Sequence, residues 1–338
     1  MTYLRAFLGL VACLGAVLPG PARALDRLQL AVIVNVRDPL SVKIGQYYAQ
    51  QRRIIFQNFI KVSFARDRAM LTREEFEQIQ EQVARQTRPE VQAYALTWAA
   101  PYRVECMSIT AAFAFGFDEA LCADGCGPTR RSPYFNSNAR LPFTQLRMRP
   151  TMSIAARTFE DARTLIDRGV KSDGSHPKGT AYLLSTSDES RNVRSALYRQ
   201  VDRVLTHDVQ ARRLAQDELR DAGDVLFYFI GKERVEGLET LGFLPGAIAD
   251  HLTSAGGEMP DSGQMSALRW LEAGATGSFG TVAEPCNLPQ KFPNPAIVIG
   301  RYLRGETLIE AYWKSVLMPG QGIFIGEPLA APFRRDNK

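Results

Sequence analysis

Short, almost uninterrupted apolar runs recur along this 338-residue chain, and segments with helical periodicity lie between them. Such runs occur at residues 29–36, 180–186, 224–231 and 275–282. A strand that is apolar along its whole length is buried on both faces, as in a parallel sheet that helices cover. The alternation of strands and helices therefore predicts an α/β fold, with a doubly wound, mostly parallel sheet and helices on both of its faces.

The first strand–helix–strand unit occupies residues 29–64. Asp38 can accept hydrogen bonds from the free amides of a helix whose first position holds Pro39, and residues 54–64 return as a strand. Asn35 and Asp38 follow the first strand, where α/β folds often bind ligands. A structural role in the turn or at the start of the helix would also account for Asn35 and Asp38.

Local sequence patterns predict several further helices and strands. Thr72 and Glu75 have the spacing of a capping box at the start of a helix. We expect strands at 102–114 and 224–231 and helices at 190–207 and 209–221. The strand 224–231 is the most apolar of the chain, so we expect it near the centre of the sheet.

Residues 1–24 have the features of an export signal. Arg5 precedes the apolar residues 6–18, and Ala22-Arg23-Ala24 places small residues where a signal peptidase requires them. The sequence around Cys13 also resembles a lipid-attachment site, which would anchor the protein there. Residues 25–338 are expected to form a single α/β domain, with a candidate sub-division near 150–175 and an irregular insertion at about 115–146. The exported chain would be periplasmic or secreted.

Composition excludes several classes of function. A net charge of +5 with dispersed arginines is too weak for a nucleic-acid-binding surface. No apolar run reaches the roughly 18 residues of a membrane span. The chain has three histidines, none at ligand spacing from a cysteine pair, so we expect neither a metal nor a cofactor. The oligomeric state is left open.

Four cysteines follow the export signal: Cys106, Cys122, Cys126 and Cys286. An even number of cysteines in an exported protein favours disulfides. Cys122 and Cys126 could close a tight loop, which would leave Cys106 and Cys286 as the other pair. Three pairings are open, and we favour this one.

The stretch 231–286 carries the candidate site. One apolar run ends in Asp250, His251, Thr253 and Ser254, and a second delivers Ser278, Thr281, Glu284 and Cys286. Polar and titratable residues at the ends of strands are how α/β proteins build sites.

Several stretches resemble an uncharacterised family of exported bacterial proteins, among them Asp250-His-Leu-Thr-Ser254, Gly274-Ala-Thr-Gly-Ser-Phe-Gly280 and Gly322-Ile-Phe-Ile-Gly-Glu-Pro-Leu329. The order of the last strands also resembles, more distantly, the gingipain-type cysteine peptidases of the caspase-like clan. That resemblance implies a caspase-like topology with a histidine after one central strand and a nucleophilic cysteine after the next.

The chain departs from this peptidase pattern at both positions. Lys232 stands where the histidine would be, and Asp250-His-Leu-Thr-Ser254 stands where the cysteine would be. The resemblance therefore implies a caspase-like domain that has lost its dyad.

Two functions fit these residues. In the first, which we favour, the chain is a non-catalytic or repurposed domain that binds a peptide or a glycan. The ligand-binding candidates are Asn35, Asp38, Lys232, Asp250, Thr253, Ser278, Thr281 and Glu310. The aromatic residues Trp270, Phe279, Tyr312 and Trp313 are available for stacking, although their spacing also suits a core.

In the second, the chain is a hydrolase. His251 would be the base and Ser254 or Cys286 the nucleophile. Asp250 would point to the opposite face of the strand from His251, so Glu284 or Glu310 is the better residue to orient the imidazole.

Overall fold

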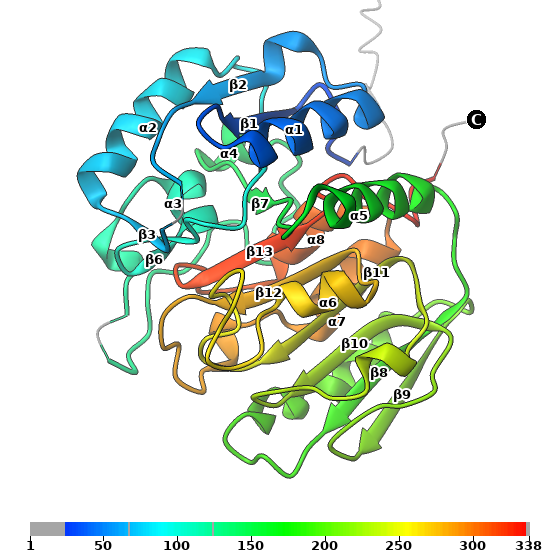
Figure 1. Ribbon diagram of the computed structural model, residues 1–338. Helices are drawn as coiled ribbons and strands as arrows, with labels where there is room; N and C mark the ends of the chain where they lie inside the picture. Colours follow the sequence, from blue (N-terminus) through cyan, green and yellow to red (C-terminus); the bar gives the residue numbers. More distant parts are fainter. Residues whose placement is uncertain (1–23, 67, 124, 336–338) are drawn as a thin grey trace, which may run out of the picture.

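The computed structural model describes residues 24–66, 68–123 and 125–335, and its centre is one twisted ten-stranded sheet (Figure 1). The expected export signal, apart from Ala24, and the lipid-attachment position Cys13 lie outside the described residues. In spatial order the strands are β2 (Phe59–Val62), β1 (Leu30–Asn35), β4 (Ala93–Leu96), β7 (Thr151–Ser153), β13 (Gly322–Gly326), β12 (Gly277–Thr281), β11 (Phe243–Leu252), β10 (Val225–Gly231), β8 (Gly179–Ser185) and β9 (Val209–Ala215).

Every neighbouring pair in this sheet is parallel except β12 and β13. These two strands are antiparallel, with Gly277 opposite Gly326 and Thr281 opposite Gly322. The sheet therefore consists of two parallel halves that run in opposite directions. As a result, the strand ends that follow β1, β4 and β7 lie at the edge opposite to the strand ends that follow β8, β10 and β11.

Helices cover both faces, as the alternating pattern predicts (Figure 1). The face toward the viewer carries α1 (Pro39–Arg52), α5 (Phe159–Ser172) and α6 (Leu268–Ala273). The other face carries α2 (Arg73–Gln86), α3 (Ile109–Phe115), the 3₁₀ helix η3 (Asn192–Arg203), α7 (Pro295–Leu303) and α8 (Leu308–Ser315). The expected α/β fold, mostly parallel with helices on both faces, is confirmed.

Local signals account for several of these elements. The Asp38 side chain accepts a hydrogen bond from the amide of Leu40 and so caps α1. Thr72 and Glu75 form the expected capping box of α2. β1 is buried along its whole length, as a continuously apolar strand requires.

Three expected elements differ in the structure. Residues 102–114 hold two short strands, β5 (Arg103–Val104) and β6 (Met107–Ser108), and then α3, which the Ser108 side chain caps. β5 pairs with β6 and with β3 (Met70–Leu71) in a small separate sheet.

The other two differences lie at the far edge of the main sheet. The segment expected as an α-helix over 190–207 is the 3₁₀ helix η3, and the one expected as a surface helix over 209–221 contains the edge strand β9. Because β9 pairs with β8 along its whole length, sheet pairing overrides its polar sequence. β10 is therefore the third strand from that edge and does not lie at the centre.

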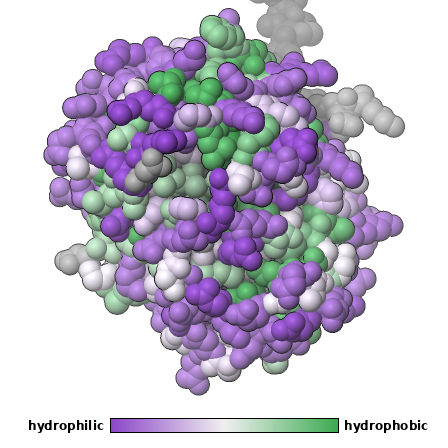
Figure 2. Space-filling view, viewed as in Figure 1, coloured by the Kyte–Doolittle hydropathy of each residue, from purple (hydrophilic) through white to green (hydrophobic). Residues whose placement is uncertain are grey.

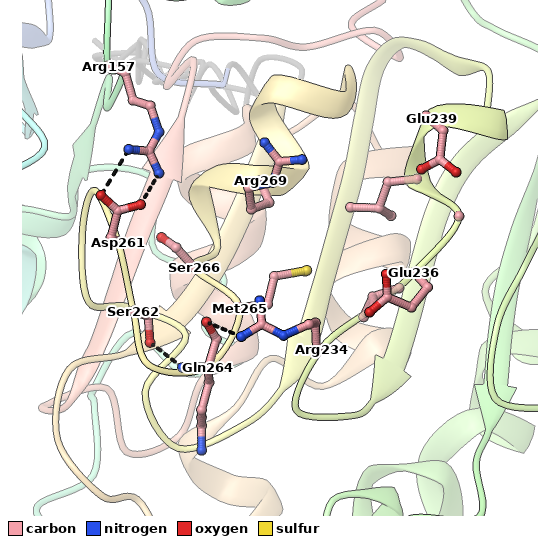
Figure 3. Close-up of a pocket in the computed structure, with 13 residues that line it drawn as sticks. Arg157, Arg234, Glu236, Glu239, Asp261, Ser262, Gln264, Met265, Ser266 and Arg269 are labelled. Atoms are coloured by element: carbon pink, nitrogen blue, oxygen red, sulfur yellow. Dashed lines mark hydrogen bonds and ion pairs between the residues drawn. The ribbon is translucent and has the colours of Figure 1, made fainter.

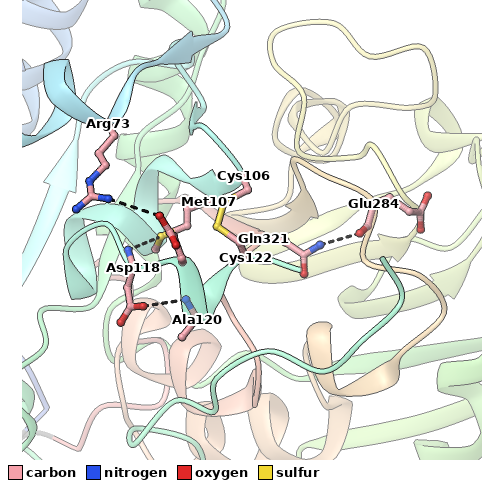
Figure 4. The surroundings of a disulfide bond; sticks show 9 residues. Arg73, Cys106, Met107, Asp118, Ala120, Cys122, Glu284 and Gln321 are labelled. Atoms are coloured by element: carbon pink, nitrogen blue, oxygen red, sulfur yellow. Dashed lines mark hydrogen bonds and ion pairs between the residues drawn. A yellow bond between two sulfur atoms is a disulfide. The ribbon is translucent and has the colours of Figure 1, made fainter. Parts of the chain in front are cut away.

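Two disulfides hold the irregular segment between α3 and β7. Cys106 bonds to Cys122, and Figure 4 shows this bond beside the turn that joins β5 and β6. Cys126 bonds to Cys286, with 5.3 Å between their Cα atoms. The favoured pairing of Cys122 with Cys126 is therefore wrong, because the chain folds back so that Cys122 faces the β5–β6 turn and Cys126 faces the loop after β12.

None of the described helices is long and apolar enough to cross a membrane. Hydrophilic residues dominate the face shown in Figure 2, and apolar residues form small separate patches there. Because disulfides persist in oxidising compartments, the two disulfides indicate such an environment for this chain.

Candidate functional site

The carboxyl ends of β8, β10, β11 and β12 meet at one edge of the sheet. The register pairs Ile230 with His251 and Gly231 with Leu252, which sets Lys232 beside Thr253. This is the edge where α/β folds place their sites, and it is where the sequence predicts one.

His251 lies on the face that carries α6, and its side chain is only 1% exposed. Its Nδ1 accepts a hydrogen bond from the Trp270 indole at 2.9 Å, so Nδ1 carries no proton. Its Nε2 then carries the proton and donates it to the Met265 carbonyl at 3.0 Å. Because both ring nitrogens are engaged, neither can activate Ser254 or Cys286, and the expected catalytic role of His251 does not fit this geometry.

Burial lowers the pKa of His251 to about 3. We predict that its ring signals in NMR spectra keep the neutral Nε2–H form from about pH 5 to pH 8, across the range in which an ordinary histidine titrates. The unfolded chain, with a histidine pKa of about 6.5, takes up a proton at a higher pH than the folded chain. The stability from neutral burial is therefore complete above about pH 6.5 and is lost progressively as the pH falls toward 3.

The matched measurement is urea unfolding of the wild type and of His251→Asn at several pH values. The wild type should lose up to about 1.4 kcal/mol more per pH unit than the variant in this window. A His251 signal that titrates near pH 6.5 in the folded protein would contradict the prediction.

The other candidate catalytic residues have structural roles. Cys286 is oxidised in its disulfide with Cys126, so it presents no thiolate. The Glu284 carboxylate accepts a hydrogen bond from the Cys286 amide at 2.7 Å and stays exposed. Ser254 contributes its backbone carbonyl to the hydroxyl of Thr281. The structure therefore does not assemble these residues around His251.

Asp250 points to the opposite face from His251, as the alternation along a strand requires. There it forms an ion pair with Arg194 from η3, and these side chains are 0% and 1% exposed. Arg194 also donates to the Ile230 carbonyl at 3.1 Å. Burial opposes the charge of Arg194, and the Asp250 carboxylate outweighs it, so the pKa of Arg194 lies above its ordinary value. Asp250 therefore anchors η3 to the sheet and lies on the opposite face from His251.

Polar side chains at the strand ends bind one another. The Thr253 hydroxyl donates to Gln264 at 2.7 Å and accepts from Arg191 at 3.1 Å. Lys232 donates to the Asp217 carbonyl at 3.1 Å. These contacts join the loops that follow β8, β9, β10 and β11 into one network at the strand ends.

The remaining ligand-binding candidates lie elsewhere. Asn35 bonds to Phe64 and Arg37 in the turn after β1, and that turn and the Asp38 cap lie at the opposite edge of the sheet. Glu310 belongs to the capping box of α8 on the far face. Ser278 and Thr281 are buried within β12. The structure thus does not bring the eight candidates together.

An open pocket of about 230 Å³ adjoins this network, and Figure 3 shows the residues that line it. One wall is the loop after β10, with Arg234, Glu236 and Glu239. The opposite wall includes Asp261 and Arg269, from the loop after β11 and from α6. Apolar atoms at its base come from Val235, Leu238 and Met265.

Some charged side chains of the pocket form ion pairs and others do not. Arg157 binds the carboxylates of Asp261 and Glu272, and Arg269 also binds Glu272. Glu236 and Glu239 are exposed and form no ion pair or hydrogen bond with another described side chain, although the charge of Arg220 interacts with that of Glu239. Sequence reasoning missed these residues because they lie in a charged loop that looks like ordinary surface. The position of that loop directly after β10 was the one available signal.

A wider hollow of about 660 Å³ lies on the same face, over the ends of β1 and β4. Asp38, Trp98 and Met259 line it, and it shares Arg157 with the smaller pocket. Asp38 is the one candidate from the sequence that borders it.

No protein-family model matches the chain, and no curated protein matches it. A solved structure described as that of a protease superposes with a TM-score of 0.53 and 10% identity, over 91% of this chain and 79% of that one. A complex of the pro- and mature domains of Porphyromonas gingivalis RgpB superposes more loosely, with a TM-score of 0.44, 8% identity and coverage of 90% and 79%. The first match shows that this fold is shared with a protease, so the resemblance to a peptidase fold that the sequence predicts is confirmed.

Proposed function

We propose that this chain is an exported, non-catalytic α/β domain that binds an extended peptide in the pocket between the loops after β10 and β11. One observation carries the proposal: the polar groups at the strand ends are bound to one another, while the adjoining pocket is open. A peptidase of this fold would need free reactive groups at those strand ends, and a binding domain needs only the pocket.

The lining of the pocket favours a peptide over a glycan. None of its lining residues has an aromatic ring. The four aromatic residues offered by the sequence, Trp270, Phe279, Tyr312 and Trp313, are fully buried in the core. A peptide instead finds backbone partners and a small apolar base, together with charged walls.

The carboxylates of Glu236 and Glu239 indicate which kind of peptide would bind. Glu236 and Glu239 come from the same short segment, and the arginines of the opposite wall are neutralised by Asp261 and Glu272. On the same wall, Arg234 contacts only backbone carbonyl oxygens, and the charge of Arg220 already acts on Glu239. Glu236 is therefore the carboxylate best placed to attract a positively charged side chain. We infer that the bound peptide carries a lysine or an arginine at this point.

We predict that a double charge reversal, Glu236→Lys with Glu239→Lys, raises the dissociation constant of a lysine-containing peptide about tenfold or more. Exposed ion pairs contribute about 0.2–1 kcal/mol each, and reversal adds repulsion to their loss. The measurement is isothermal titration with three hexapeptides that differ only in a central lysine, glutamine or glutamate.

A matched control has the same net charge. Glu74→Lys with Glu81→Lys changes two exposed carboxylates on α2, in the other half of the sheet. This control should bind the lysine peptide as the wild type does. Equal affinity of the wild type for all three peptides, or equal weakening in both double variants, would refute the proposed site.

A further inference from the structure

The backbone nitrogen of Leu25 lies against a buried carboxylate near the other end of the chain. Leu25 N is 3.1 Å from Glu310 Oε2. Leu25 is 1% exposed and Glu310 is 2% exposed, and the Leu25 side chain is part of the main hydrophobic core. This contact joins the segment before β1 to α8 on the far face of the sheet.

Glu310 differs from the other buried carboxylates in its partners. Asp250 and Glu327 each contact an arginine. Glu310 accepts hydrogen bonds from Thr307, at 3.0 Å from its amide and 2.7 Å from its hydroxyl, but no cation of the described residues contacts it. Lys314, the nearest cation on the same helix, lies 3.0 Å from Glu306 instead.

Desolvation of a buried carboxylate is costly, and for Glu310 the charge of Lys314 offsets it only in part. Burial accordingly raises the pKa of Glu310 above its ordinary value. A positive charge at Leu25 N would offset this cost at the distance already present, 3.1 Å from Glu310 Oε2.

The sequence puts a cleavage junction at the same bond. Ala22-Arg23-Ala24 matches the small-residue pattern before a signal-peptidase cut, and Leu25 is the next residue. Hydrolysis by a signal peptidase consumes one water, breaks the bond between the Ala24 carbonyl carbon and Leu25 N, and leaves a carboxylate on Ala24. Leu25 N becomes an α-ammonium, which has an ordinary pKa of about 8 and is charged at neutral pH.

We propose that removal of residues 1–24 creates an α-ammonium at Leu25 that forms a buried ion pair with Glu310. The fold thus contains a preformed site for its own processed N-terminus. Export and folding are coupled, because processing turns this hydrogen bond into an ion pair, which the precursor lacks. This inference does not depend on peptide binding, so either proposal can fail without the other.

The test compares a protein that starts at Leu25 with one that retains residues 20–24. Each is made with the wild-type sequence and with Glu310→Gln, which keeps the capping box and removes the charge. In urea, the unfolding constant of the Leu25-start protein should be about tenfold lower, or more, than that of the extended protein. With Glu310→Gln this advantage should disappear or reverse, because the α-ammonium is then buried without a counter-charge.

Two further measurements keep the proposal falsifiable if Glu310→Gln does not fold. Acetylation of the Leu25 α-amino group should raise the unfolding constant to that of the extended protein. The full-length chain, expressed in a bacterial host and recovered after export, should begin at Leu25. Equal unfolding constants for the Leu25-start and extended proteins, a ratio that persists in Glu310→Gln, or a mature start at another residue such as Cys13 would overturn the proposal.

Discussion

Replacement of Asp250 by alanine is expected to lower the free energy of unfolding by about 3–5 kcal/mol, because it leaves the Arg194 guanidinium buried without its counter-charge. Both side chains are excluded from solvent, and Arg194 also binds the carbonyl oxygens of Ile230 and Asp250. Urea unfolding followed by circular dichroism measures the loss. The pair holds η3 against β10 and β11, so the effect should be cooperative across this half of the sheet.

A second variant separates the charge from the packing. Arg194→Met with Asp250→Leu replaces the pair by apolar groups and should recover most of the stability, since buried ion pairs gain little over apolar contacts. The exposed pair of Arg213 and Asp202 provides the control, and Asp202→Ala should cost less than about 1 kcal/mol. If Asp250→Ala costs no more than Asp202→Ala, the pair is not a stabilising anchor.

Removal of the disulfide between Cys126 and Cys286, by replacing both residues with serine, should cost up to about 5 kcal/mol. The two cysteines are 160 residues apart, so the bond restricts a large part of the unfolded chain. Cys106 and Cys122 are 16 residues apart, and the same chain-entropy account assigns their bond about 3 kcal/mol. Urea unfolding of the two double-serine variants checks the order of the two effects.

The disulfide with Cys126 also determines whether Cys286 has a free thiol. The reduced wild-type protein should be less stable and should still hydrolyse no peptide, ester or amide substrate, because the ring nitrogens of His251 remain occupied by Met265 and Trp270. Activity that appears on reduction and disappears in Cys286→Ser would identify Cys286 as a masked nucleophile and would contradict the non-catalytic proposal.

The parts of the fold that follow from local sequence could be predicted. The apolar run of β1, the Asp38 cap and the Thr72–Glu75 capping box each depend on neighbouring residues, and each occurs as expected. Pairings between distant residues could not be predicted. β9 forms a strand because it pairs with the edge of β8. Cys126 and Cys286 come together only after the chain has folded back.

The candidate site shows the same division. The sequence places Lys232 and Thr253 after successive strands, and the structure pairs these two strands side by side. It cannot show that Thr253 binds Gln264 and Arg191 or that Trp270 and Met265 occupy both nitrogens of His251. Those contacts depend on where the loops and α6 lie in the folded chain.

The open pocket could not be predicted from the sequence, because a charged loop that lines a pocket has the same composition as an ordinary surface loop. Glu236 and Glu239 become notable only when the structure shows that the arginines across from them are already paired. A loop that directly follows an inner strand of an α/β sheet is therefore worth the same scrutiny as the strand-end residues themselves.

The most direct test of the central claim is to hold the lysine-containing hexapeptide at saturating concentration with the oxidised protein and to follow its mass over several hours. A domain that binds without chemistry should show saturable binding that the Glu236→Lys, Glu239→Lys variant weakens, and the peptide should be recovered intact. Cleavage of the peptide by the wild type, abolished in Ser254→Ala or His251→Ala, would contradict the claim and support the alternative that the chain is a hydrolase.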